Sequence, residues 1–226
     1  MSELRPHALL RLFQLSSAAL PIGAFAYSQG LEQAVALGDV RCRDTAADWI
    51  SGMLKRSLLT LDVPVLGRLQ RAMVAGDLAQ ARRWNDYLFA ARGSAELRAE
   101  ERQVGAALLR LLTREDVAGT ADWAGQPRVT LACCFALAGV AWSAPVSEVA
   151  LAYTFAWCEQ QVGAATRLVP LGQTDAQRVL SVLIEGAAAG VAESLSLPDG
   201  ELASTTPGQL LLSALHETQY SRLFRS

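Results

Sequence analysis

Residues 174–191, TDAQRVLSVLIEGAAAGV, carry the clearest secondary-structure signal in this sequence. Apolar residues recur there at the spacing of one helix face. They are Leu180, Leu183, Ile184, Ala187 and Val191. Thr174 and Gln177 form the pattern of a capping box, so we expect the helix to start at Thr174. The stretch therefore predicts a long amphipathic α-helix with one buried face.

Helical spacing recurs along the rest of the chain, whereas the period-two alternation that marks strands is nearly absent. Thr45 and Asp48 form a second capping-box pattern, and Pro64 predicts a kink or a new helix start. Further helices are expected from Asp77 through Leu88, from Ser94 to about Leu112, from Pro145 to Leu168, and from Pro207 to near His216. No repeat or low-complexity linker divides the chain. We predict an all-α fold, a single-domain helical bundle of roughly eight to ten helices over residues 1–226.

The composition argues against one class of function and suggests another. The 226 residues carry a formal net charge of −2, so the chain as a whole offers no electrostatic case for nucleic-acid binding. Charged residues make up 19% of the chain and hydrophobic residues 51%, which is apolar for a water-soluble protein. We expect a protein partner or a second copy to cover part of this apolar surface.

Two stretches resemble membrane-targeting segments. The triplet at residues 24–26 mimics a signal-peptide cleavage site, but Arg11 and Gln14 interrupt the apolar run that a signal peptide needs. Residues 129–147 carry no charge and are long enough to span a bilayer, yet their apolar content is mostly Ala, which contributes little insertion energy. We therefore expect a small-residue helix inside a helical core and a cytoplasmic protein without membrane contact. An integral membrane protein through residues 129–147 is the alternative.

The sequence offers little catalytic or metal-binding chemistry. The four cysteines form no C-x-x-C pair, and Cys133 and Cys134 project about 100° apart on a helix, so buried free thiols in a reducing compartment are the simplest interpretation. His7 and His216 lie near opposite ends of the chain, where a histidine is more often solvated than catalytic. No metalloprotease, phosphate-loop or dinucleotide-binding motif is present. We predict no enzymatic activity, no metal site and no stably bound cofactor.

Two polar segments are candidates for protein contacts. Residues 92–103 are rich in charge, which is typical either of a solvated helix face or of the polar rim of an interface, and the sequence favours neither. Residues 217–226 mix Tyr220 and Phe224 with arginines, and these residue types anchor protein interfaces. Because a frayed terminus would not be expected to hold large apolar residues, we expect this C-terminal tail to dock, either on its own domain or on a partner.

The stretch SSAALPIGAFAYSQGLE, residues 16–32, sets Phe25 and Tyr27 among small residues. Pro21 and Gly23 favour a tight, non-helical approach, and Ser28 is well placed as the N-cap of a helix over residues 29–37. No general base accompanies the stretch, which argues against a catalytic loop. The pattern predicts a contact surface on which Phe25 and Tyr27 face a partner.

Four stretches taken together resemble one family, the UreF urease accessory proteins. They are LPIGAFAYSQGLE at residues 20–32, Glu-Leu-Arg at 96–98 with Gly105 downstream, VPLGQTDAQRVL at 169–180, and YSRLFRS at 220–226. One such motif would be weak, but all four occur in the family's order and at similar spacing. The resemblance therefore spans nearly the whole chain.

This resemblance implies a function carried out through protein partners. It implies an all-helical, cytoplasmic homodimer that acts with UreD (also called UreH) and the GTPase UreG to deliver nickel to apo-urease. In that scheme UreF recruits UreG and gates its GTP hydrolysis, UreD orders the UreF C-terminal tail, and nickel and GTP are handled by the partners.

The resemblance also implies which residues bind partners. The family's aromatic anchor falls on Phe25 and the arginine of its terminal motif on Arg222, and we expect these two to lie close together. Many members have tyrosine at the first position, so a contact through the hydroxyl group does not apply to Phe25, and only the role of apolar anchor does. Tyr27 stands where other members can have histidine. The predicted partner-binding residues are Phe25, Tyr27, Ser28, Gly30, Glu32, Glu96, Arg98, Gln173, Tyr220, Arg222 and Leu223.

A second hypothesis makes the chain a GTPase-activating protein for UreG that supplies an arginine finger. A planar guanidinium can stabilise the charge that develops during phosphoryl transfer. Arg98, Arg102 and Arg222 are the candidates for that role.

Overall fold

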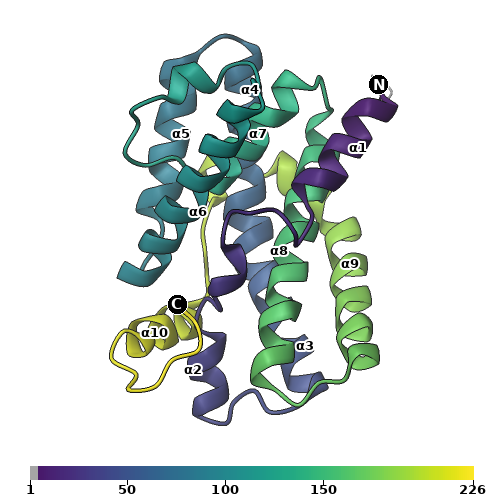
Figure 1. Ribbon diagram of the computed structural model, residues 1–226, viewed down its shortest axis with the longest axis vertical. Coiled ribbons are helices and arrows are strands. Elements are labelled where there is room, and N and C mark those ends of the chain that lie inside the picture. The colour runs from purple at the N-terminus through teal and green to yellow at the C-terminus, as the bar shows by residue number, and fades with distance from the viewer. Residues whose placement is uncertain (1–4) are drawn as a thin grey trace.

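The computed structural model describes residues 5–226, and within this range the chain is all-α, without a β-strand. Its α-helices are α1 to α10 in Figure 1. The predicted fold class is therefore confirmed, and the number of helices agrees with the expectation.

Helix α8, Val146–Leu168, lies at the centre of the bundle (Figure 1). It packs against α4 (Val63–Val74), α7 (Leu131–Ala141) and α9 (Gln173–Ser196). Small residues let α7 approach closely, since a Cβ added at Gly139 would come 2.6 Å from a methyl carbon of α8. Because α7 is buried almost throughout, this part of residues 129–147 is the core helix that its composition predicted.

Helix α3 runs into α4 without a break. It spans Arg43–Met53 and is followed by a π-helix, Leu54–Asp62, which leads directly into α4. A π-helix of this length is unusual, since such widened turns mostly occur singly inside α-helices. The kink or new start predicted at Pro64 therefore takes the form of a widened helix just before the proline.

The carbonyl groups of the π-helix hold the extended segment that precedes α10. Pro64 has no N–H to donate, so the carbonyl of Thr60, four residues earlier, lacks an α-helical partner. That carbonyl accepts a hydrogen bond from the N–H of Ala203 at 3.2 Å, and the carbonyl of Arg56 accepts one from Thr205 at 2.8 Å. The widened helix thereby fixes where the chain enters α10.

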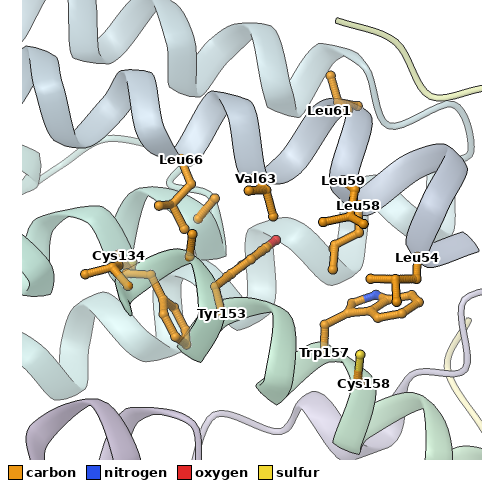
Figure 2. Packing of buried hydrophobic residues seen from close by; sticks show 14 of the residues in the cluster. Leu54, Leu58, Leu59, Leu61, Val63, Leu66, Cys134, Tyr153, Trp157 and Cys158 are labelled. Carbon is orange, nitrogen blue, oxygen red and sulfur yellow. The ribbon is translucent and has the colours of Figure 1, made fainter. Parts of the chain in front are cut away.

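Figure 2 shows the hydrophobic core between the π-helix, α4 and α8. Leu54 and Leu58 point towards Trp157, and Val63 lies beside Tyr153. All five side chains are buried. Each large apolar side chain removed from water contributes about 1.5–3 kcal/mol, so this seam is a main source of stability.

Helices α5, Leu78–Ala90, and α6, Ala95–Arg114, begin where the sequence predicted. The side chains of Asp77 and Ser94 each accept a hydrogen bond from a backbone N–H of the first turn, at 2.8 and 3.1 Å. Such a cap satisfies one of the donors that a helix start leaves free. The expectation for both helices is confirmed.

The remaining elements surround this core. They are α1 (Pro6–Leu15), α2 (Leu31–Ala36), α10 (Pro207–His216) and three short 3₁₀ turns, Ala24–Ala26, Thr120–Trp123 and Asp199–Glu201. Helix α1 packs on α8, and α10 packs on α2 and α6. The C-terminus consequently lies beside α2 and α10 (Figure 1).

The two helix starts predicted from threonine capping patterns are wrong. The hydroxyl of Thr45 accepts a hydrogen bond from the N–H of Cys42 at 3.1 Å, so Thr45 is the third helical residue and Cys42 is the N-cap. Helix α9 starts at Gln173, and no side chain caps it, so Thr174 lies inside the first turn. In both cases the threonine pattern marked the correct turn but not its first residue.

The apolar stripe of α9 is only partly buried. Leu183 is fully buried, as expected, but Ile184 is 44% exposed, because α9 packs against its neighbours on one side. Among the described residues, α9 is the one helix that is long and apolar enough to cross a membrane by length and composition. Part of the apolar excess of the sequence therefore lies on the outer face of α9.

The cysteines follow the prediction with one exception. Cys133, Cys134 and Cys158 are buried free thiols, and burial raises the pKa of Cys158 to about 12. Cys42 is exposed at the start of α3, so the expectation that all four thiols are buried is wrong for this residue. Its N-cap position keeps it at the surface.

We expect Gly105→Ala to destabilise the fold severely. A Cβ at this position in α6 would lie 1.8 Å from the carbonyl oxygen of Val129, a backbone atom that no rotamer change can move. The free energy of unfolding, measured by urea denaturation, should fall by more than about 3 kcal/mol. The matched control is Gly52→Ala in α3, where a Cβ meets nothing within 4 Å and stability should rise by about 0.5–1 kcal/mol. Equal stability of the two variants would contradict the close approach of the two segments.

Candidate functional site

The C-terminal tail, residues 217–226, docks on its own domain and lies over the loop that precedes α2. The N–H and the hydroxyl of Ser28 donate to the carbonyl oxygen of Ser226 at 2.8 and 2.5 Å. The N–H of Arg225 donates to the carbonyl oxygen of Ala26 at 2.8 Å. Of the two outcomes that the sequence left open, docking on the domain itself is the one observed.

Glu32 holds the tail by its backbone. One carboxylate oxygen accepts the N–H of Leu223 at 2.7 Å, and the other accepts the N–H of Phe224 at 2.8 Å. Hydrogen bonds to a charged group contribute about 1.5–3 kcal/mol each. Because Glu32 is buried, these bonds are shielded from competing water.

His216 is buried between two glutamates, which the sequence did not indicate. Its Nδ1 lies 2.8 Å from a carboxylate oxygen of Glu96, and its Nε2 lies 3.1 Å from one of Glu32. The other oxygen of Glu96 accepts a hydrogen bond from Arg222 at 3.0 Å. The expectation of a solvated histidine is wrong here, because α10 turns His216 inward against α2 and α6, whereas His7 is exposed.

Backbone geometry at the start of α2 brings Glu32 to the tail. Gly30 has φ +88°, a conformation that favours glycine, and its Cα lies so close to α10 that a Cβ would be 3.2 Å from a carbonyl oxygen there. Helix α2 begins at Leu31, so the prediction that Ser28 is its N-cap is wrong. The hydroxyl of Ser28 instead accepts the N–H of Glu32 at 3.2 Å while it donates to the tail.

Phe25 and Tyr27 lie in opposite environments. Phe25 is 61% exposed, whereas Tyr27 is 3% exposed and its hydroxyl donates to the side-chain oxygen of Gln103 on α6 at 2.6 Å. Burial raises the pKa of Tyr27 above its ordinary value. The expectation that both rings face a partner is therefore wrong for Tyr27, whose ring fills the space between the loop and α6.

Arg167 of α8 connects Phe25 to the tail. Its guanidinium carbon lies 5.7 Å from the ring centre of Phe25 and 5.8 Å from that of Phe224. Its Nη1 also donates to the carbonyl oxygen of Phe25 at 3.1 Å. Among the described contacts, the link from Phe25 to the tail therefore passes through Arg167 and Phe224, whereas Arg222 is held separately by Glu96.

The tail turns several large side chains outward while its backbone is held. Tyr220, Arg222 and Leu223 are exposed, and Phe224 is buried. Tyr220, Arg222 and Leu223 therefore expose aromatic, guanidinium and aliphatic groups on the tail, and Phe25 exposes a second aromatic ring on the loop that the tail covers. Arginine and large aromatic residues are the side chains most often found as interface hot spots.

The acidic residues of the charged segment 92–103 point into the protein, so neither sequence interpretation describes them. Glu96, Glu100 and Glu101 are all held by neighbouring side chains or backbone groups. The arginines differ, since Arg98 donates to the carbonyl oxygen of Arg92 at 2.6 Å and Arg102 is exposed. The three acids of the segment thus face inward together with the buried Arg92, whereas Arg102 lies on the outer side.

Glu100 lies beneath the tail. Gln29 donates to one of its oxygens at 2.8 Å, Gln160 donates to the same oxygen at 3.4 Å, and the hydroxyl of Ser226 donates to the other at 3.3 Å. Burial nevertheless dominates and raises the pKa of Glu100 to about 7. The tail therefore rests on a carboxyl group that titrates near neutral pH.

Gln173 belongs to α9, whose main packing partners are α8, α3 and the π-helix. It is the first residue of α9, and α9 and α10 lie on opposite sides of α8 in Figure 1. Sequence reasoning also missed contributors, since it treated His216 as solvated and did not single out Arg167, Glu100 or Gln160. One usable signal was the four-residue spacing of Glu96 and Glu100, which puts both on one side of α6.

The histidine and the glutamates beneath the tail are engaged by neighbouring groups. Both ring nitrogens of His216 face carboxylates, so neither is available to activate a hydroxyl group. Residues 5–226 contain no group of three or more His, Cys, Asp or Glu side chains placed to hold a metal ion.

The comparisons with known proteins agree on one family. The UreF family model matches residues 40–184, and the chain is 46% identical to the urease accessory protein UreF of Alkalilimnicola ehrlichii over 216 residues, which cover 96% of this chain and 95% of that protein. The chain belongs to the UreF family. The UreF protein of Chromohalobacter salexigens is 44% identical to this UreF-family chain, and the alignment covers 100% of this chain and 98% of that protein. The UreF protein of Citrobacter koseri is 42% identical, and the alignment covers 96% of this chain and 97% of that protein.

We expect Glu32→Ala to release the tail while the bundle stays folded. The substitution removes the acceptor of two backbone N–H groups and one of the two carboxylates beside His216. In hydrogen–deuterium exchange, the amides of Leu223 and Phe224 should exchange at least about 10-fold faster, while amides of α8 keep their protection. The matched control is Glu193→Ala, on the exposed face of α9. Unchanged exchange at residues 223 and 224 would show that Glu32 does not hold the tail.

We expect Glu100 to make the stability of the chain depend on pH. Its pKa is raised from an ordinary value of 4.5 to about 7, so between these values the folded state binds more protons than the unfolded state. Stability should therefore fall as pH rises through this window, by up to about 3 kcal/mol. Glu100→Gln keeps an acceptor for Gln29 and removes the titration. Urea denaturation at pH 5 and pH 8 should show wild type losing more stability than the variant, and equal losses would contradict the raised pKa.

Proposed function

We propose that this chain is a scaffold for urease maturation, which binds UreD (UreH), recruits the UreG GTPase to apo-urease and gates GTP-dependent insertion of nickel into the urease active site. It acts in the cytoplasm as a homodimer and has no catalytic turnover of its own. Nickel and GTP are handled by the partner proteins. Membership in the UreF family supports this assignment, together with the surface described above.

The observation that carries the proposal is an exposed set of anchor side chains on a firmly held backbone. The ring of Phe25 packs against the guanidinium of Arg167. Glu32 fixes the backbone of the tail at Leu223, and the side chains of Leu223 and its neighbour Arg222 are exposed there. A surface ordered before binding loses less conformational entropy when a partner docks. This arrangement supports recruitment of a protein at the tail.

Apolar side chains elsewhere on the surface support further contacts. Leu10 and Phe13 of α1 and Val182 of α9 are each more than half exposed. Contiguous apolar patches are typical of surfaces that another protein covers, and Leu10 and Phe13 are neighbours three residues apart in α1. They offer area for UreD or a second copy in addition to the surface around the tail.

We expect Phe25→Ala/Arg222→Ala to lose UreG while retaining the fold. Both side chains are exposed, so their truncation leaves the core intact, but it removes an apolar anchor and a guanidinium. Affinity for UreG, measured by biolayer interferometry with UreD present, should fall at least about 30-fold.

The matched control for this pair is Val74→Ala/Arg83→Ala, which removes an exposed apolar side chain and an exposed arginine from α4 and α5. The control should bind UreG as wild type does. Wild-type affinity of the Phe25/Arg222 variant would overturn the assignment of this surface to UreG.

GTPase activation by an arginine finger is the second candidate. An arginine finger needs an exposed guanidinium that is free to reach a phosphate. Arg222 is engaged by Glu96 and Arg98 by the carbonyl of Arg92, whereas Arg102 is exposed and its guanidinium has no hydrogen-bond partner among the described residues. If Arg102 acts as an arginine finger, Arg102→Ala should lower the rate at which UreG hydrolyses GTP, measured at saturating UreG. An unchanged rate supports scaffolding alone.

A further inference from the structure

Three arginines surround a broad pocket beside the tail. The pocket lies between α6 and the loop at residues 22–27, and its volume is about 410 Å³. Arg102 and Arg110 come from α6 and Arg225 comes from the tail. All three are exposed, and the small side chain of Ala106, one turn from each of the α6 arginines, leaves space between them.

The positive charge of this arginine pocket is not balanced locally. None of its described lining residues is acidic, and none of the three arginines forms an ion pair within residues 5–226. The side chain that accepts a hydrogen bond from Arg225 is the neutral amide of Gln103, at 3.3 Å. On a chain with a net charge of −2, three guanidinium groups that lack an ion-pair partner around one pocket are a local excess of positive charge.

The pocket geometry favours carboxylates over a single phosphate. Phosphate sites usually present backbone N–H groups at a helix start, but Arg102 and Arg110 lie in the middle of α6, where the N–H groups are used within the helix. Eight residues of helix separate the two arginines by about 12 Å. Two side-chain carboxylates about four residues apart on an extended segment span such a distance, and guanidinium groups bind carboxylates in a bidentate manner.

We propose that the arginine pocket binds an acidic segment of a protein partner, with glutamate or aspartate side chains meeting Arg102, Arg110 and Arg225. The pocket adjoins the surface around Phe25 through the loop at residues 22–27. The inference rests on the proposed function in one respect, because it takes the acidic segment to belong to the protein that is recruited there.

The first test measures UreG binding to Arg102→Ala/Arg110→Ala in the presence of UreD. Affinity at about 50 mM salt should fall at least about 10-fold, and the loss of affinity on going to about 300 mM salt should be smaller than for wild type, since screened charge pairs are removed. The control Arg83→Ala/Arg178→Ala removes two exposed arginines from α5 and α9 and should behave as wild type. Wild-type affinity and salt dependence of the Arg102/Arg110 variant would overturn the inference while leaving the proposed function standing.

The second test does not need UreG. A peptide of alternating Glu and Ala should bind the full wild-type chain in isothermal titration calorimetry, and the same peptide with Gln in place of Glu should not. Arg102→Ala/Arg110→Ala should lose the Glu peptide. Equal binding of both peptides, or binding of inorganic phosphate without the Glu peptide, would overturn the inference. If UreG does not bind wild type at all, the proposed function fails, and the peptide result still decides what the pocket binds.

Discussion

The buried guanidinium of Arg92 is the constraint on which the rest of the bundle depends. It contacts Asp62 at 2.5 Å and Glu101 at 2.7 Å, and these two carboxylates raise its pKa well above the ordinary value although burial opposes the charged form. Asp62 also accepts the hydroxyl of Tyr153, and Glu101 accepts the N–H of Leu131. The π-helix, α6, α7 and α8 are therefore joined at one ion network. Breaking a buried pair of this kind costs about 3–5 kcal/mol, because the remaining charge stays buried without its partner.

Helix α6 carries this constraint from the core to the surface. Glu101 faces Arg92, whereas the preceding acids Glu100 and Glu96 face the tail and His216. One helix thus holds the core network and the tail with side chains from two consecutive turns. The outer face of the same helix bears Arg102, so the position of the exposed cation is set by the same contacts that fix the buried acids. A rigid helix of this kind is a suitable base for a binding surface.

Sequence reasoning recovers what depends on local pattern. Helix spacing and the caps at Asp77 and Ser94 predict real elements because a helix start is satisfied by its own first turn. The burial of Tyr27 and His216 could not be predicted in the same way. Their surroundings are assembled from segments more than a hundred residues apart, or from a neighbouring helix whose orientation is set by tertiary packing. The motif around Phe25 located the candidate surface, but which of its two rings is exposed depends on the position of α6.

How the tail is held determines which of its groups can serve recognition. Glu32 and Ser28 bind backbone N–H and C=O groups of the tail, which every non-proline residue supplies. The attachment therefore does not consume the side chains of Tyr220 and Leu223, which remain exposed. Arg222 differs from these two, because its contact with Glu96 must be exchanged or shared when a partner carboxylate or aromatic ring approaches. A partly exposed ion pair contributes about 0–1 kcal/mol, so this exchange costs little compared with the contacts that an interface arginine can form.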